Sequence, residues 1–76
     1  MSGALHTKRY RKFCQRLVEA RKSAGITQAQ LADALRKPQS YVAKCEAAQR
    51  RLDVVEFLDW ANAIGVEPAK IIAGLE

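Results

Sequence analysis

Two short helix-forming segments separated by a tight turn lie between Thr27 and Glu46, in the stretch TQAQLADALRKPQSYVAKCE. Thr27 and Gln30 have the spacing of a capping box, in which two side-chain oxygens accept from free backbone N–H groups at a helix start. The apolar residues that follow at helical spacing, and that we expect to be buried, are Leu31, Ala32 and Leu35. The pattern therefore predicts a short helix over residues 27–35.

The turn after this helix is marked by Pro38. Proline disfavours helical geometry in the residue before it, Lys37, and it suits the start of a helix. A second short helix is therefore predicted to run from about residue 38 to residue 47. We expect its inner face to hold Val42 and Cys45, which leaves a polar outer face of Gln39, Ser40, Ala43 and Lys44.

Three further helices are predicted around these two. The first covers residues 8–24 and ends at Gly25, with an apolar stripe of Tyr10, Phe13, Leu17, Ala20 and Ala24. The fourth starts at a capping pair, Asp53 and Glu56, ends at Gly65, and carries Val54, Phe57, Leu58, Ala61 and Ile64 on one face. A short fifth helix starts at Glu67-Pro68 and contains Ile71, Ile72 and Leu75.

No segment alternates with the period of two that marks a strand, so the predicted fold class is all-α, a compact five-helix bundle. Residues 1–9 are expected to form a flexible basic arm, and residues 10–76 the folded domain. No apolar run approaches the roughly 18 residues that a membrane span requires, and the first ten residues lack the apolar stretch of a signal peptide. We therefore expect a cytoplasmic protein.

Charge is distributed unevenly along the chain, whose net charge is +5. Residues 1–52 hold twelve of the thirteen Lys and Arg but three of the eight Asp and Glu, a net charge of +9, and residues 53–76 have a net charge of −4. Such a split suggests that the first two thirds of the chain face a polyanion, although a solvated basic helix would give the same pattern.

The two cysteines, Cys14 and Cys45, are interpreted as small buried apolar residues, as expected of a reduced chain. Neither they nor the single histidine, His6, stand at metal-ligand spacing, so no metal and no cofactor are predicted. The sequence also lacks a nucleophile–base constellation and a phosphate-cradling glycine loop. An enzyme is therefore not expected.

The run Gly25 to Ala32, GITQAQLA, and the run Pro38 to Glu46, PQSYVAKCE, resemble the Cro/repressor (Xre, Cro/C1-type) helix-turn-helix family. The later stretch from Leu52-Asp53 to Val66-Glu67-Pro68 matches the family's fourth helix and its ending, so the resemblance covers about residues 10–70. It implies a lambda-repressor-like fold of bacterial or phage origin. It also implies a sequence-specific transcriptional regulator that inserts its third helix, about residues 38–47, into the major groove of double-stranded DNA.

The resemblance assigns DNA contacts to individual residues. Gln28, at the start of the second helix, would bond a phosphate with help from the positive end of the helix dipole. The residues implied to lie against base edges are Gln39, Ser40, Tyr41 and Lys44. Gln39 suits adenine, Lys44 suits guanine or a phosphate, and Tyr41 would pack on a sugar or a thymine methyl or else cover the edge of the core. The implied phosphate contacts beside them are Arg36, Lys37, Gln49, Arg50 and Arg51, the last two of which an ordinary solvated loop would also explain.

Arg21 and Glu46 stand where the family commonly has an ion pair, which would orient the third helix. Two turns depart from the family pattern, because Arg36 follows the second helix and Ala47-Ala48-Gln49 follows the third where glycine is usual. A non-glycine residue in the left-handed conformation costs about 1 kcal/mol. The shape of these turns is therefore open at this point.

A homodimer on a palindromic operator is the natural partner arrangement, with half-sites about 34–36 Å apart. The candidate interface residues, which would otherwise complete the core, are Trp60, Ile64, Val66, Ile71, Ile72 and Leu75. The simplest action is repression by occupying an operator. The alternatives are a DNA-binding antitoxin, which would also bind a toxin protein, and a helical protein-interaction module with no role at DNA.

Overall fold

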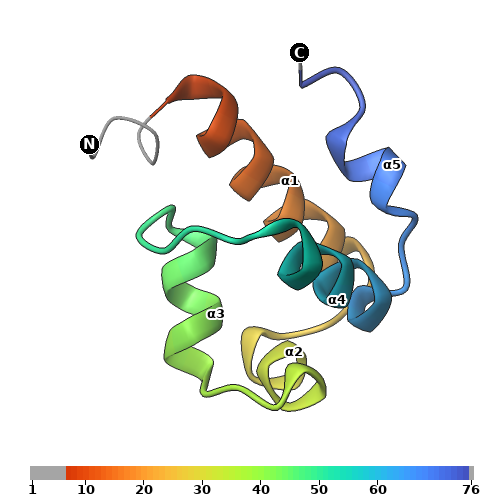
Figure 1. Cartoon of the computed structure of the whole chain (residues 1–76). Helices are drawn as coiled ribbons and strands as arrows, with labels where there is room; N and C mark the ends of the chain where they lie inside the picture. Colours follow the sequence, from red (N-terminus) through yellow and green to blue (C-terminus); the bar gives the residue numbers. More distant parts are fainter. Residues whose placement is uncertain (1–6, 76) are drawn as a thin grey trace.

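The computed structural model describes residues 7–75, which form five helices and contain no strand (Figure 1). The helices are α1 (Lys8–Ser23), α2 (Gln28–Leu35), α3 (Gln39–Glu46), α4 (Val54–Ile64) and α5 (Pro68–Ile72). The prediction of an all-α, five-helix bundle is confirmed. The predicted arm over residues 1–9 falls mostly on residues 1–6, which lie outside the described residues, and Lys8 and Arg9 belong to the first turn of α1.

The helix starts are capped by the side chains that the sequence indicated. At α2 the Gln30 backbone N–H donates to the Thr27 hydroxyl at 3.1 Å, and the Thr27 N–H donates to the Gln30 side-chain oxygen at 2.9 Å. At α4 the Glu56 N–H donates to the Asp53 carboxylate at 2.7 Å, and the Asp53 N–H donates to Glu56 at 3.0 Å. Both predicted capping boxes are therefore present.

The helix ends fall into two kinds. α1 and α4 end at Gly25 (φ 73°) and Gly65 (φ 85°), where glycine takes the left-handed conformation without steric cost. α2 and α3 are followed instead by Arg36 (φ 58°) and Ala48 (φ 60°), the only non-glycine residues with positive φ between residues 7 and 75. Both turns thus keep the left-handed shape that glycine usually provides, so the two departures noted in the sequence change the strain of the turns and not their shape.

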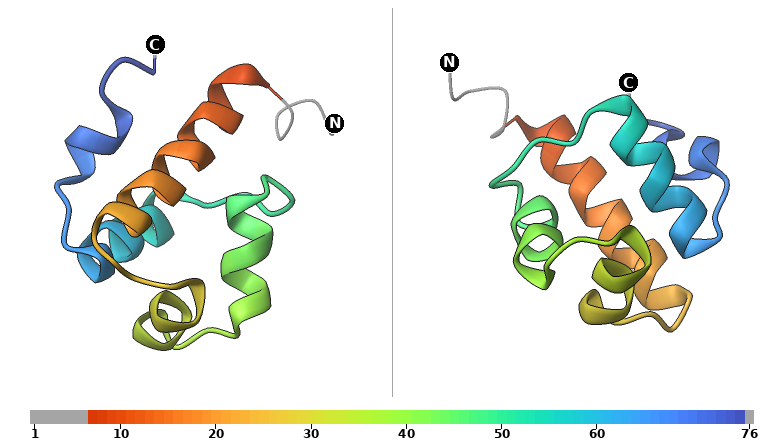
Figure 2. Two further views of the ribbon diagram at one scale, coloured as in Figure 1. Left: turned by 180° about the vertical axis from the view of Figure 1, so that it is seen from behind. Right: turned by 60° about the horizontal axis from the view of Figure 1, so that its bottom comes forward.

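The core lies between α1, α2, α3 and α4, and α5 packs against α1 and α4 (Figure 1). Its completely buried side chains include Leu17, Leu31, Val42, Cys45 and Trp60. Cys14 is also buried, and both cysteines are free, as expected for small apolar residues. All views place α3 and α5 on opposite sides of the molecule (Figure 2).

Three of the predicted interface residues lie in this core instead. Trp60, Ile64 and Ile71 have exposed fractions of 0%, 7% and 3%, so they complete the core, which is the alternative that the sequence left open beside a dimer interface. The reason is packing: the period of 3.6 puts Trp60 and Ile64 on the same face of α4 as Phe57, and that face meets the other helices. Val66 is also packed against the core, whereas Ile72 is exposed and Leu75 half-buried beyond the end of α5.

Two residues assigned to the buried face of α4 are exposed. Val54 is 73% exposed because it occupies the first turn of the helix, and Leu58 is 46% exposed because it lies about 100° around the axis from Phe57. The predicted inner face of α4 is therefore narrower than the sequence suggested. Their exposure leaves apolar side chains on the surface of the molecule.

No helix within residues 7–75 is long and apolar enough to span a membrane. In the same range no group of three or more His, Cys, Asp and Glu side chains is placed to hold a metal ion. His6 lies outside the described residues.

Candidate nucleic-acid interface

The outer face of α3 is polar and exposed. Its inward residues, Val42 and Cys45, are buried, whereas Gln39, Ser40 and Lys44 are exposed. Pro38 precedes the helix and makes no side-chain hydrogen bond to its start. The helix therefore presents amide, hydroxyl and ammonium groups on its exposed face. Helix α3 itself lies at one side of the molecule (Figure 2).

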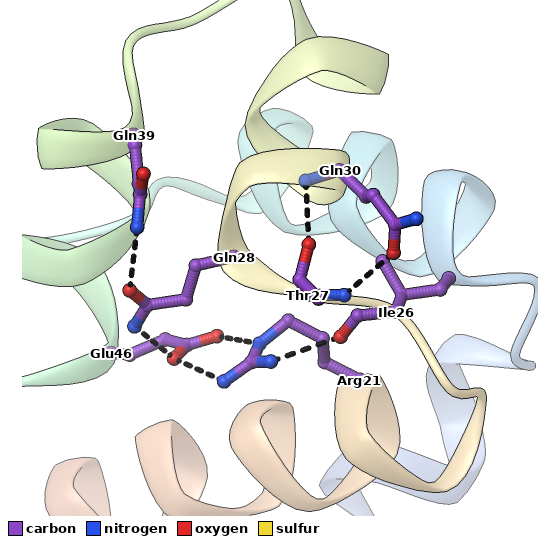
Figure 3. A network of polar contacts seen from close by, with 7 residues as sticks. All are labelled: Arg21, Ile26, Thr27, Gln28, Gln30, Gln39 and Glu46. Carbon is purple, nitrogen blue, oxygen red and sulfur yellow. Dashed lines mark hydrogen bonds and ion pairs between the residues drawn. The ribbon is translucent and has the colours of Figure 1, made fainter.

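A buried ion pair anchors the C-terminal end of α3 to α1 (Figure 3). Arg21 Nε donates to Glu46 Oε2 at 2.7 Å and Arg21 Nη2 donates to Glu46 Oε1 at 3.0 Å, a two-pronged geometry that suits guanidinium and carboxylate. The third nitrogen, Arg21 Nη1, donates to the Ile26 carbonyl at 2.9 Å. The structure thus brings together the two residues that the resemblance implied to pair, and it adds the α1–α2 connection to the same bond network.

Gln28 joins this network. Its Nε2 donates to Glu46 Oε1 at 2.9 Å, and its Oε1 accepts from Gln39 Nε2 at 3.5 Å (Figure 3). A primary amide has two N–H donors, so one remains for the phosphate contact expected of Gln28. Sequence reasoning missed both of these bonds, because nothing in the local pattern indicates that the start of α2 faces the end of α3.

Tyr41 covers the edge of the core, one of the two alternatives that the sequence left open. Its side chain is half-buried, and its hydroxyl accepts a hydrogen bond from Trp60 Nε1 at 3.2 Å. This burial raises the pKa of the Tyr41 hydroxyl. Lys37 Nζ and Arg50 Cζ lie 5.4 and 4.9 Å from the centre of its ring. Tyr41 therefore positions two cations beside α3.

The other basic residues flank both ends of α3. Arg36 and Lys37 are exposed in the turn before it, and Gln49, Arg50 and Arg51 are exposed in the loop after it. Arg50 also pairs with Glu56, with Nη2 and Oε2 at 3.1 Å, and this hydrogen bond lowers the pKa of the Glu56 carboxyl. The charge of Arg50 is thus partly neutralised by Glu56.

The loop after α3 is also attached to the start of α1. The Leu52 backbone N–H donates to the Tyr10 hydroxyl at 3.0 Å, and the Arg51 guanidinium lies 5.4 Å from the centre of the Tyr10 ring. The first two turns of α1 carry four exposed cations, Lys8, Arg9, Arg11 and Lys12, and its first turn has no acidic residue. A basic surface therefore continues from the loop onto α1, which suits a polyanion.

Comparisons with known proteins agree with this geometry. A Helix-turn-helix family model matches residues 17–71. An XRE-family like protein from Pseudomonas syringae pv. tomato str. DC3000 is 46% identical over 96% of this chain and 89% of its own, with a TM-score of 0.85. The restriction-modification controller protein C.AhdI from Aeromonas hydrophila is 38% identical over 79% of this chain and 91% of its own, with a TM-score of 0.73. A search of curated proteins gives no match.

Proposed function

The chain belongs to the Cro/C1-type (Xre) helix-turn-helix family of DNA-binding transcription regulators, and on that basis we propose that it represses transcription as a homodimer on a palindromic operator. Each protomer inserts α3 into the major groove, and the bound protein blocks access of polymerase to the promoter. The observation that carries this proposal is the exposed polar face of α3 between basic residues at both of its ends.

The base contacts in this proposal come from α3. Gln39 bonds adenine through its amide, Ser40 bonds a neighbouring base edge, and Lys44, one turn later, reaches a guanine or a phosphate. Tyr41 contributes only its exposed edge, since its hydroxyl is bonded to Trp60. The phosphate contacts come from Gln28, Arg36, Lys37, Gln49, Arg50 and Arg51, which surround the helix and carry no base preference of their own.

The homodimer in this proposal uses an apolar surface that we call the α4–α5 patch, formed by Val54, Val55, Leu58 and Ile72. These four are the exposed large hydrophobic side chains of residues 7–75. Val54, Leu58 and Ile72 line a mostly apolar groove of about 380 Å³ whose walls include Phe13 and Phe57. Contiguous apolar surface of this kind is typical of association sites. Of the interface residues expected from the sequence, Ile72 belongs to this patch. Leu75 is half-buried three residues further along the chain.

The test is DNA binding followed by fluorescence anisotropy. The protein is titrated into labelled DNA from upstream of its own gene and into a scrambled duplex of the same composition, from about 50 to 200 mM salt. We expect the upstream DNA to bind at least about 10³-fold more tightly than the scrambled duplex. Gln39→Ala should reduce that ratio without changing the salt slope, whereas Asn62→Ala, an exposed amide on α4, should change neither.

Equal affinity for both duplexes with a steep salt dependence would contradict sequence-specific regulation and leave a general DNA-binding fold. Absence of binding at low salt would contradict any role at DNA and favour a protein partner.

A further inference from the structure

Glu46 lies at the centre of the polar network and accepts three hydrogen bonds (Figure 3). Two of them come from Arg21, and the third comes from Gln28 Nε2, at 2.9 Å to Oε1. An ionised carboxylate has no proton to donate, so it bonds only the amino side of the Gln28 amide. Glu46 therefore fixes the orientation of the Gln28 side-chain amide, whose oxygen points toward α3.

The orientation of the Gln28 amide in turn fixes the orientation of the Gln39 amide. The Gln28 oxygen accepts from Gln39 Nε2 at 3.5 Å, and because a carbonyl oxygen only accepts, Gln39 has to turn an N–H toward it. Gln39 is otherwise exposed at the first position of α3. The groups that it retains for a molecule outside the protein are one N–H donor and its side-chain oxygen.

This remaining pair of groups distinguishes two bases. In the major groove, adenine presents an acceptor, N7, beside a donor, the N6 amino group, and guanine presents two acceptors, N7 and O6. One N–H and one oxygen of Gln39 match adenine. Guanine requires both N–H donors, and it can have them only if Gln39 gives up its hydrogen bond to Gln28.

We propose that Glu46 is a positioning residue that makes the recognition helix prefer adenine over guanine, acting through Gln28 and Gln39 without touching a base. The proposal rests on the proposed function, because it requires Gln39 to face a base pair in the major groove. Arg21 supports the arrangement by holding both carboxylate oxygens, so the chain of bonds runs from α1 through the end of α3 and the start of α2 to the first residue of α3.

The decisive variant is Glu46→Gln. When the amide oxygen at position 46 takes the place of Oε2 and keeps the bond from Arg21 Nε, the new amino group takes the place of Oε1, which gives up the bond from Arg21 Nη2. This amino group faces Gln28, and Gln28 turns its own oxygen toward it. The Gln28 amino group then points at Gln39, which offers its oxygen inward and both N–H donors outward. This arrangement suits guanine, so the base preference at one operator position should shift from adenine toward guanine.

Binding sites are first selected from a random duplex library with wild type and with Gln39→Ala. The operator position at which only the Gln39→Ala variant shows no base preference is the one that Gln39 contacts. The selected site is then titrated by anisotropy with adenine or with guanine at that position. Wild type should prefer adenine by about 5- to 150-fold, the range that one bidentate base contact gives. Glu46→Gln should lower this ratio about tenfold or reverse it, with the other positions unchanged.

Two further variants separate positioning from stability. Gln28→Met removes both amide contacts, leaves the Arg21–Glu46 pair in place, and should weaken the adenine preference in a protein that folds normally. Tyr10→Phe removes the acceptor of the Leu52 N–H, which lies outside the network, and should lower the melting temperature without changing the preference. Circular dichroism melts establish whether each variant is folded at the assay temperature. If Glu46→Gln is unfolded at that temperature, Gln28→Met serves as the test.

An adenine-to-guanine ratio that stays at the wild-type value in Gln28→Met, and in Glu46→Gln where that variant is folded, would overturn the proposal and leave the proposed function intact. A wild-type protein that selects no motif from the library would instead overturn the proposed function, and this inference with it.

Discussion

Arg21 Nε and Glu46 Oε2 lie 2.7 Å apart, and only 9% and 5% of the two side chains are exposed. The pair joins the last turn of α1 to the last residue of α3, so the orientation of α3 is fixed relative to α1. Both charges are removed from water, and each has its hydrogen-bonding groups satisfied by the other or by Gln28 and Ile26. Loss of either partner therefore leaves a buried charge without compensation.

The first prediction concerns this pair. Arg21→Met should destabilise the fold by about 3–5 kcal/mol, because Glu46 remains buried without its cation. For a chain of this size the melting temperature should fall by at least about 12 °C. Thermal unfolding followed by circular dichroism measures the change. Arg50→Met breaks the exposed pair with Glu56 and serves as the control, for which little change is expected. Equal shifts in the two variants would refute the structural role of the buried pair.

The second prediction concerns the strained turn between α2 and α3. Arg36→Gly should raise the free energy of unfolding by up to about 1 kcal/mol, because glycine takes φ 58° without steric cost. The same change should weaken DNA binding and reduce its salt slope, because the substitution removes a proposed phosphate contact. Urea unfolding and a salt series of anisotropy titrations measure the two effects. A more stable variant with unchanged affinity would remove Arg36 from the interface, and a less stable one would contradict the strain.

The third prediction concerns the α4–α5 patch. Leu58→Lys should weaken self-association at least about tenfold, because an unpaired ammonium would be buried in the interface. The melting temperature of the monomer should change little, since Leu58 is exposed. Sedimentation velocity across a concentration series measures the association constant. Ser23→Lys adds the same charge to an exposed position at the end of α1, outside the patch, and should leave the association constant unchanged. A monomeric wild type at all concentrations would count against the dimer.

The fourth prediction concerns alkaline pH. Burial raises the pKa of the Tyr10 hydroxyl and of the Cys14 and Cys45 thiols above their ordinary values of 10.0 and 9.0. These groups therefore lose protons more readily in the unfolded chain. Stability should be fully present below about pH 9 and decline as the pH rises through the folded-state pKa values. Urea unfolding at pH 8 and pH 10 measures the loss. A double variant, Cys14→Ala with Cys45→Ala, should lose less stability between these pH values, and an equal loss would assign the decline to other groups.

Much of the fold could be predicted from the sequence because its signals are local. The capping boxes at Thr27 and Asp53 each involve side chains three residues apart, and Gly25 and Gly65 end their helices through their own backbone freedom. The position of Arg36 in a glycine-type turn was likewise visible from the family pattern. Such features depend on a few neighbouring residues, so no knowledge of the packing is needed.

The errors arose where packing decides. An apolar residue on a short chain suits both a core and an interface. The sequence therefore did not decide that Trp60, Ile64 and Ile71 lie in the core. It also did not indicate that Val54 and Leu58 lie on the surface. The bond between Gln28 and Glu46 joins residues 18 positions apart, which face one another only when α2 and α3 are docked. The contacts of Gln39, Ser40 and Lys44 with bases stay predictions, because they depend on a molecule outside the chain.

The hydrogen bond from Trp60 to Tyr41 makes the intrinsic tryptophan fluorescence of the protein a reporter of the position of α3. Trp60 is the only tryptophan of the chain, it is fully buried on α4, and its indole nitrogen is bonded to a residue of α3. Its emission in the folded state therefore comes from one site, and a tilt of α3 against α4 alters the surroundings of that site. Unlabelled protein mixed with DNA should thus reveal whether α3 enters the groove as a rigid body, with constant emission wavelength, or adjusts as it enters.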